Sequence, residues 1–478
     1  MRLTTSPLFA VGFAALMATS APAQQMAQSV LDQYIGDMRA AGMTVTPGNA
    51  TSTSNSVELT NIEVSDASGL TYTIAFVRAE EIGGDKVQLF YPEAFDMSID
   101  ADGEQPAMDI AVRLSGIEHI VSGAVESRQH DVKAAGMDFT AKSADGTVDM
   151  TFGLGDFISQ TTRTDGAVPN HVGKMKAASL TVKQRINDGF SNILTDITYN
   201  NLTLAVDVDT ISEDKIEELF NGARNLKLTY GAESGQGVID INNSDFNGVV
   251  DMTYGAAGAD ISVQDGIASF VTEGRDASYT VKMKDLPFPP FQASMDTVAM
   301  TFSAPLKKTD ETVPAAIKMS IGGLKASDTI WGMIDPAGTI PRDAANLNID
   351  LTANMKWLVD LMQAADQPAP PVEVESVDIN DVTLEIGGAA FNGKGSAILD
   401  NTQMPPMPIG SVDLDLKGGL GLIDKLVGIG VLPEQQAQMA KMMSGMFTLP
   451  GGDGPDHLTS KIEMKEDGAI LANGQRLQ

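Results

Sequence analysis

Hydrophobic and polar residues alternate with a period of two over much of this chain. The segment NLTLAVDVD places Leu202, Leu204, Val206 and Val208 on one side, with polar or small residues between them. Because successive side chains of a strand point to opposite faces, this pattern predicts a strand with one buried and one solvated face. Such one-sided burial is typical of antiparallel sheets, since buried parallel strands read as continuous hydrophobic runs.

The same alternation recurs along the sequence, and turn-forming Gly, Asn and Asp residues separate the runs. Further runs lie at residues 62–64, 148–152, 279–284, 317–321, 347–351, 412–417 and 462–464. Between Ile379 and Val382 the alternation changes phase, which predicts a tight turn or bulge at Asn380-Asp381. We therefore expect a mainly β fold of long, twisted antiparallel sheets, forming a sandwich or a curved groove, with a few short helices.

Helical periodicity is confined to short segments. Apolar residues at helical spacing predict helices within 27–42, 211–224, 355–366, 421–432 and 433–447, the last two forming a helical pair near 420–447. Ser29 is the expected N-cap of the first helix, and Pro433 the expected first residue of the last. The last helix carries a methionine stripe, interpreted as core packing, with a ligand-facing lid as the alternative. This stripe consists of Met439, Met442, Met443 and Met446.

Proline-rich segments interrupt the chain at 287–291, 368–371 and 405–408. Proline donates no backbone hydrogen bond, so it stops helices and is excluded from inner strands. We take the first of these segments as the boundary between an N-terminal β-rich half, residues 24–286, and a C-terminal β-rich half, residues 287–478.

The N-terminus has the pattern of a secretory signal peptide. Arg2 precedes an apolar run from Leu8 to Ala18, and Ala21-Pro22-Ala23 forms a small-residue cleavage site. The apolar run is shorter than the roughly 20 residues that a spanning helix needs. We expect cleavage of residues 1–23, a periplasmic location, and no transmembrane segment in the mature chain.

The composition narrows the range of partners. A net charge of −31 repels the phosphates of nucleic acids at long range, so we expect no nucleic acid partner. The chain has no cysteine, which excludes disulfides, thiol catalysis and thiolate metal sites. A lipid or an envelope protein stays open as a partner, and the sequence does not predict the oligomeric state.

No motif for catalysis, cofactor binding or metal binding stands out. The four histidines lack the helical spacing of a zinc site; they are His119, His130, His171 and His457. The segment Gly388–Gly395 resembles a phosphate-binding loop, but it ends in glycine and precedes a strand-like run, so a hairpin turn is expected. We therefore assign no catalytic, cofactor-binding or metal-binding residue and expect no cofactor.

Residues 327–351 combine a tryptophan, prolines, a glycine and one arginine among aspartates. Ser327 or Asp328 is expected to cap a short helix that buries Trp331. Asp335 or Asp343 is the expected partner of Arg342. We interpret the segment as a structural corner between two strands, with a binding site as the alternative. The residues of this corner are Trp331, Asp335, Pro336, Gly338, Pro341, Arg342 and Asp343.

The corner, followed by an alternating strand, resembles the signature of an uncharacterised family of exported alphaproteobacterial proteins, known only as a domain of unknown function. The N-terminal order of signal peptide, short helix and alternating strands is similar as well. Ala344 stands where the signature has a second proline. The resemblance implies a periplasmic protein, and it implies no known activity and no catalytic residue.

These observations favour a non-enzymatic exported envelope protein, a structural or interaction scaffold whose apolar strand faces close on each other as a sandwich core. The first alternative is the binding of lipid or another apolar ligand in a β-sheet groove. The second is an unrecognised hydrolase. A closed core, an open apolar face, or a polar site with converging carboxylates would separate the three.

Overall fold

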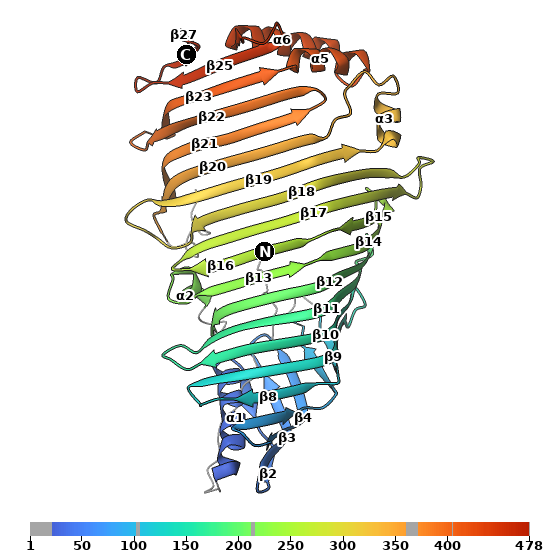
Figure 1. Ribbon diagram of the computed structural model, residues 1–478, viewed down its shortest axis with the longest axis vertical. Coiled ribbons are helices and arrows are strands. Elements are labelled where there is room, and N and C mark those ends of the chain that lie inside the picture. The colour runs from blue at the N-terminus through green and yellow to red at the C-terminus, as the bar shows by residue number, and fades with distance from the viewer. Residues whose placement is uncertain (1–21, 102–105, 212–215, 360–370, 404, 478) are drawn as a thin grey trace. The chain divides into compact units, whose positions relative to one another are not determined.

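The computed structural model describes residues 22–101, 106–211, 216–359, 371–403 and 405–477 (Figure 1). The protein is mainly β, as expected, with 62% of its residues in strands and 12% in helices. Backbone contacts divide it into two compact units. Unit 1 holds the described residues up to Leu219 together with Arg224–Val249, and unit 2 holds Phe220–Ala223 and the residues from Val250 onward. Helix α2 (Ile216–Phe220) and strand β15 (Asn247–Tyr254) cross this division.

Unit 1 is an antiparallel sheet in which β9, β10, β11 and β12 pair in sequence order. Its strands are β1 (Thr44–Thr46), β2 (Asn49–Ser52), β3 (Ser56–Ser65), β4 (Leu70–Glu81), β5 (Lys86–Phe90), β6 (Ala94–Ile99), β7 (Met108–Ser115), β8 (Glu118–Ser122), β9 (Ser127–Ser143), β10 (Val148–Thr164), β11 (Asn170–Asn187), β12 (Asn192–Asp209), β13 (Leu226–Ala232) and β14 (Ser234–Asn242). Strand β9 also pairs with β7 and β8, and β12 with β13 and β14.

The main core of unit 1 lies between helix α1 (Pro22–Ala40) and the first strands. Leu31, Ile35 and Met38 recur at helical spacing and are at most 1% exposed. Each such side chain contributes about 1.5–3 kcal/mol on burial, so this stripe fixes the helix to β3 and β4. The expected N-cap at Ser29 is wrong, because the helix begins earlier and Ser29 lies within it.

Single residues in the left-handed backbone region bend the long strands of unit 1. Asp156 in β10 has φ 43° and Asn201 in β12 has φ 51°. Asp and Asn tolerate this region better than most non-glycine residues. At Asp156 the alternation changes phase, so that Leu154 and Phe157 join the same apolar cluster although three positions separate them. The bend therefore keeps apolar side chains on one face from Val148 to Phe157.

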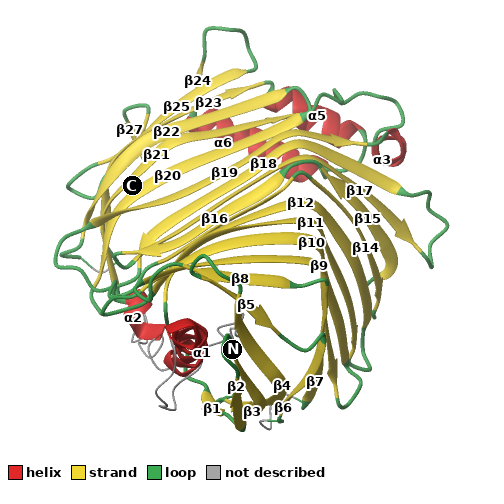
Figure 2. Cartoon of the chain, turned by 60° about the horizontal axis from the view of Figure 1, so that its bottom comes forward, coloured by secondary structure: helices red, strands yellow, loops and turns green. Residues whose placement is uncertain are grey.

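Unit 2 is one antiparallel sheet in which each strand pairs with the next in sequence order, except that β23 pairs with β25. Its strands are β16 (Ala257–Gln264), β17 (Ile267–Met283), β18 (Phe291–Pro305), β19 (Val313–Ala326), β20 (Ala345–Trp357), β21 (Val372–Ile386), β22 (Ala389–Asp400), β23 (Met407–Lys417), β24 (Leu449–Pro450), β25 (His457–Met464), β26 (Ile470–Ala472) and β27 (Gln475–Arg476). Figure 2 shows that these long strands curve along their length. The proline run at 287–291 connects β17 and β18, which pair with each other.

Three described helices belong to unit 2: α3 (Asp328–Ile334), α5 (Gly419–Gly428) and α6 (Glu434–Phe447). The helical pair expected near 420–447 is thus present, and Pro433 is the N-cap of α6 rather than its first residue. The prediction of a helix within 355–366 is wrong at its start, because Met355–Trp357 are the last residues of strand β20. Residues 360–366 of this prediction lie outside the described part of the chain. None of the described helices is long and apolar enough to cross a membrane.

Candidate functional site: an open apolar sheet face

The strand register of unit 2 aligns apolar residues into rows that run across the sheet. The central row is Phe270, Phe302, Ile317, Leu351, Ile379, Val412 and Ile462. On one side lie Met300, Met319, Ile349, Val382 and Leu414, and beyond them Val298, Ile321, Leu347, Leu384, Phe391, Leu416 and Leu458. Because directly paired residues share a face, these three rows form one surface, called here the apolar face of unit 2.

A bulge keeps this surface continuous. The register shifts between Ile379 and Val382, and also between Asp350 and Leu351 on the neighbouring strand. The extra residue lets Ile379 and Val382 occupy adjacent rows although three positions separate them. The phase change in the sequence therefore marks a bulge, one of the two predicted options.

No residue of the three rows is buried in the part of the chain that the structure describes. Met300 is 41% exposed, Phe302 38% and Ile317 47%. Within unit 2 the described strands form one sheet, and no second sheet of this unit covers the face, so its apolar side chains contact one another without being covered by the unit's own strands. The sandwich core favoured from sequence is therefore not found in unit 2, and an open face stands in its place.

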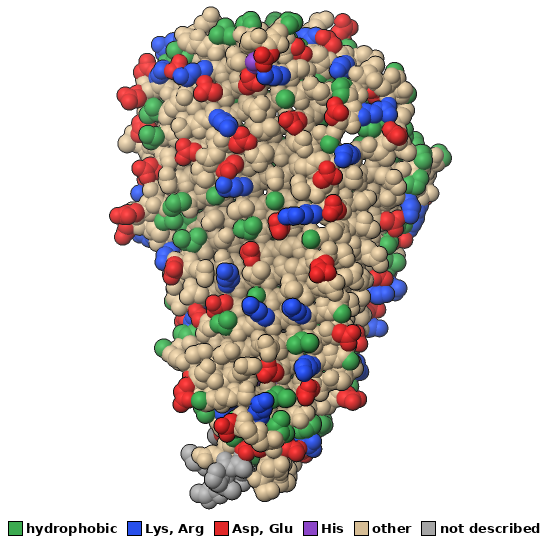
Figure 3. All heavy atoms as spheres, in the orientation of Figure 1, with side chains coloured by type: hydrophobic (Ala, Val, Ile, Leu, Met, Phe, Trp, Pro, Cys, Tyr) green, Lys and Arg blue, Asp and Glu red, His purple; other side chains and the backbone are tan. Residues whose placement is uncertain are grey.

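The opposite face of the same strands is polar. Lys318 pairs with Asp350 across β19 and β20 at 2.8 Å, and Lys394 pairs with Asp381 at 3.4 Å. The hydrogen bond from Lys318 lowers the pKa of Asp350, and the one from Asn348 lowers the pKa of Asp381. Figure 3 shows mixed basic and acidic side chains with few hydrophobic ones over these strands. The sheet thus has one solvated charged face and one open apolar face.

Unit 1 repeats this arrangement on its long strands. One row is Phe139, Phe152, Val182 and Ile197, and the next is Met137, Leu154, Leu180 and Tyr199. These side chains are half-buried. The other face carries ion pairs such as Lys183 with Asp196 at 3.0 Å. Each unit therefore offers an apolar surface that its own described residues do not cover.

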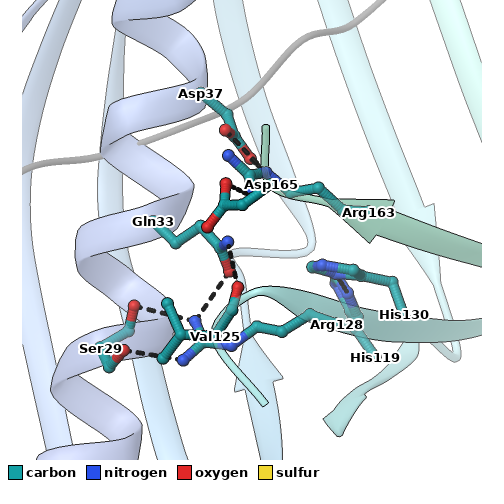
Figure 4. Close-up of polar contacts among 9 residues, drawn as sticks. All are labelled: Ser29, Gln33, Asp37, His119, Val125, Arg128, His130, Arg163 and Asp165. Carbon is teal, nitrogen blue, oxygen red and sulfur yellow. Dashed lines mark hydrogen bonds and ion pairs between the residues drawn. The ribbon is translucent and has the colours of Figure 1, made fainter. Parts of the chain in front are cut away.

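At one end of the unit 1 face, arginines hold helix α1 (Figure 4). Arg128, 1% exposed, donates to the Ser29 carbonyl at 2.9 Å and to Gln33 Oε1 at 2.8 Å. Arg163 donates from Nε to both carboxylate oxygens of Asp37, at 2.7 and 2.9 Å, and also pairs with Asp165. These contacts are made by side chains of β9 and β10 that point to the same side as Phe157, so α1 closes this end of the face.

A half-buried chain of rings lies beside these arginines. Tyr91 Oη lies 2.8 Å from His119 Nδ1, and His119 Nε2 lies 3.0 Å from His130 Nδ1. Burial lowers the pKa of His119 to about 3 and that of His130 to about 4. Both imidazoles are therefore neutral at pH 7, and the distances fit a chain in which Tyr91 donates to His119 and His119 donates to His130.

Sequence reasoning missed this cluster because the histidines belong to different strands. Arg163 and His171 are directly opposite each other across the β10–β11 hairpin. The turn residues RTDG, at 163–166, were visible in the sequence and could have suggested that pair. The contact between His119 and His130 needs the register of β8 and β9, which composition and spacing do not reveal.

The corner residues do come together, although with other partners than expected. Trp331 is half-buried rather than buried. Arg342 forms its ion pair with Asp328 at 3.1 Å, which was not expected, and it also donates to the backbone carbonyl of the expected partner Asp335 at 3.2 Å. Asp335 is fully buried. It accepts from the Ile340 amide at 2.7 Å and from the Thr339 hydroxyl at 2.9 Å, and these bonds lower its pKa.

The remaining corner residues connect α3 to β20. Pro336 and Asp343 are exposed, Gly338 has φ 67°, and the Pro341 ring lies against Gly388. That glycine belongs to the Gly387-Gly388 turn between β21 and β22, so the phosphate-loop look-alike is a hairpin turn followed by a strand. Ser327 occupies the N-cap of α3 without a side-chain capping bond. Among the described residues, no group of three or more His, Asp or Glu side chains could hold a metal ion.

The fold and the site define an antiparallel β protein whose long strands keep one face apolar and open. Residues 247–473, which include the apolar face of unit 2 and the corner, match the model of a family described as uncharacterized protein conserved in bacteria (DUF2125). A comparison with curated proteins found no match. The match agrees with the resemblance to an uncharacterised domain of unknown function, over residues 247–473, and it assigns no activity.

Proposed function

We propose that the apolar face of unit 2 binds long apolar ligands, the acyl chains of lipids. The observation that carries this proposal is the set of three neighbouring apolar rows, which remain half-buried or exposed across strands β17 to β25. Soluble proteins rarely leave a contiguous apolar patch of more than a few hundred Å² open to water, and such patches mark interaction sites.

The dimensions and chemistry of the face suit such a ligand. Neighbouring strands lie about 4.8 Å apart, so a row offers a regular series of apolar contacts to an extended chain. Burial is worth about 0.8 kcal/mol per CH₂, so a chain of about 16 carbons would gain about 13 kcal/mol before binding costs. The flexible Met300 and Met319 adapt to ligands of different shape.

The proposal includes export. Its support is the sequence pattern of a signal peptide over residues 1–23, of which residues 1–21 lie outside the described part. The mature protein is then periplasmic, where lipids of the surrounding membranes are within reach. An intact mass that begins at Gln24 supports this step, and a mass that retains Met1 contradicts it.

Titration of the full mature chain with a fluorescent fatty acid tests the binding proposal. The double variant Phe302→Gln, Ile317→Gln makes two exposed, paired positions of the central row polar. Its matched control is Thr301→Gln, Lys318→Gln, the adjacent pair on the opposite face. We expect binding at least about tenfold weaker in the first variant, which corresponds to about 1.4 kcal/mol, and unchanged in the control.

Saturable binding that is equal in both variants would place the ligand elsewhere. A parent chain that binds no fatty acid would instead favour the scaffold interpretation.

A further inference from the structure

We infer that helix α6 docks on a lipid bilayer through its methionine residues, and that lipid reaches the apolar face of unit 2 from this end. The inference rests on the proposed function and adds the source of the ligand. The methionine surface consists of Met439, Met442, Met443 and Met446.

The methionine surface is the outer side of α6. Its residues are 53%, 64%, 50% and 64% exposed, in sequence order, and their spacing places them on one side of the helix. The other side packs inward, where Ala437 is buried and Lys441 pairs with Asp424 of α5. The prediction that this methionine stripe packs into the core is therefore wrong. Four unbranched apolar side chains instead face outward, with Leu449 53% exposed just beyond them.

The local charge makes α6 a better site for contact with a membrane than the acidic rest of the protein surface. Helix α6 contains Glu434 and Lys441 as its only charged residues, a net charge of 1 − 1 = 0, and Lys441 pairs with Asp424 of α5, in a chain of net charge −31. Long-range repulsion from anionic headgroups acts on the acidic parts of the chain, and it is weaker at a helix that carries no net charge. An amphipathic helix with such a surface lies in the bilayer interface with its apolar side inserted.

The helical pair adjoins the apolar face. A Cβ atom added at Gly419, the first residue of α5, would lie 2.6 Å from Leu416 Cδ2, and Leu416 belongs to the third apolar row. Leu422 of α5 lies close to Gly387, at the turn that follows Leu384 of the same row. Figure 1 shows α5 and α6 beside β23 and β25, at the C-terminal end of the sheet. A bilayer in contact with α6 therefore meets the protein next to the end of an apolar row.

Flotation of the full mature chain with phosphatidylcholine vesicles, with and without an anionic lipid, tests the docking. The quadruple variant Met439→Gln, Met442→Gln, Met443→Gln, Met446→Gln removes the apolar surface. The control Met333→Gln, Ile398→Gln changes two apolar residues of unit 2 that are 46% and 62% exposed outside α6. We expect vesicle binding to fall at least about tenfold in the quadruple variant and to stay at the parent level in the control.

A second measurement separates this inference from the proposed function. Transfer of a fluorescent fatty acid from vesicles to the protein should slow in the quadruple variant, while its affinity for the free fatty acid stays unchanged. Absence of vesicle binding by the parent chain, or equal binding by both variants, overturns the inference. The inference is also overturned if light scattering shows that the quadruple variant has lost a dimer that the parent chain forms, while its vesicle binding is unchanged. The surface would then be the contact with a second copy of the chain. If the parent chain does not bind free fatty acid, the proposed function is contradicted instead.

Discussion

At the scale of single residues, burial decides the chemistry of the His119–His130 pair. Desolvation is the largest cause of both lowered pKa values. Repulsion between the two protonated imidazoles lowers the pKa of His119 further, and His171 and the two arginines lower that of His130. A histidine in the unfolded chain has a pKa near 6.5. Between about pH 4 and pH 6.5 the unfolded chain therefore binds more protons than the folded one, so stability falls as the pH decreases through this range.

This linkage predicts the behaviour of a variant. His119→Gln should show a smaller loss of unfolding free energy between pH 7 and pH 5 than the parent chain, measured by urea unfolding with circular dichroism. Tyr91→Phe is the matched control, because it removes a hydroxyl from the same chain of rings but leaves both imidazoles. A His119→Gln slope equal to that of the parent would contradict the assignment of a neutral histidine pair.

At the scale of elements, the bends in the strands determine where the apolar faces lie. A left-handed residue at Asp156 lets Leu154 and Phe157 point to the same side. Asp156→Gly should be tolerated within about 0.5 kcal/mol, since glycine adopts positive φ without steric cost. Asp156→Val should cost about 1–3 kcal/mol, because a β-branched residue is strained there.

The midpoints of urea unfolding of these two variants check the prediction. Equal midpoints for the glycine and valine variants would mean that the bend does not depend on the left-handed conformation of residue 156.

Many of the strands were predictable from the sequence, because period-two alternation is a local property. The strands around Leu204 and Leu414 and the bulge after Ile379 were predicted from it. The prediction of a helix from Met355 was wrong at its start. The apolar spacing there also fits a helix, and only the pairing of β20 with β21 selects the strand. The ion pair of Arg342 with Asp328 was missed because two aspartates lie nearer in the sequence, and of these Asp335 accepts a hydrogen bond from Arg342 through its backbone carbonyl.

At the scale of the whole molecule, the sequence indicated apolar strand faces but favoured a closed sandwich core over the open face that unit 2 has. That choice depends on whether a second sheet covers the first, which is a non-local property. In unit 2, residues such as Ile317 and Leu384 stay 47% and 38% exposed, and the open face follows from that. The methionine surface of α6 was misjudged for the same reason, because periodicity identifies an apolar stripe and not its orientation.

Native mass spectrometry of the full chain, purified gently from the cells that express it, is the most direct test of lipid binding. We predict protein carrying extra mass in the range of one or more lipids, and organic solvent should remove this mass. The double variant Phe302→Gln, Ile317→Gln should carry less of it, while Thr301→Gln, Lys318→Gln should carry the parent amount. Repeated spectra of ligand-free parent protein from such preparations would contradict lipid binding and favour a scaffold.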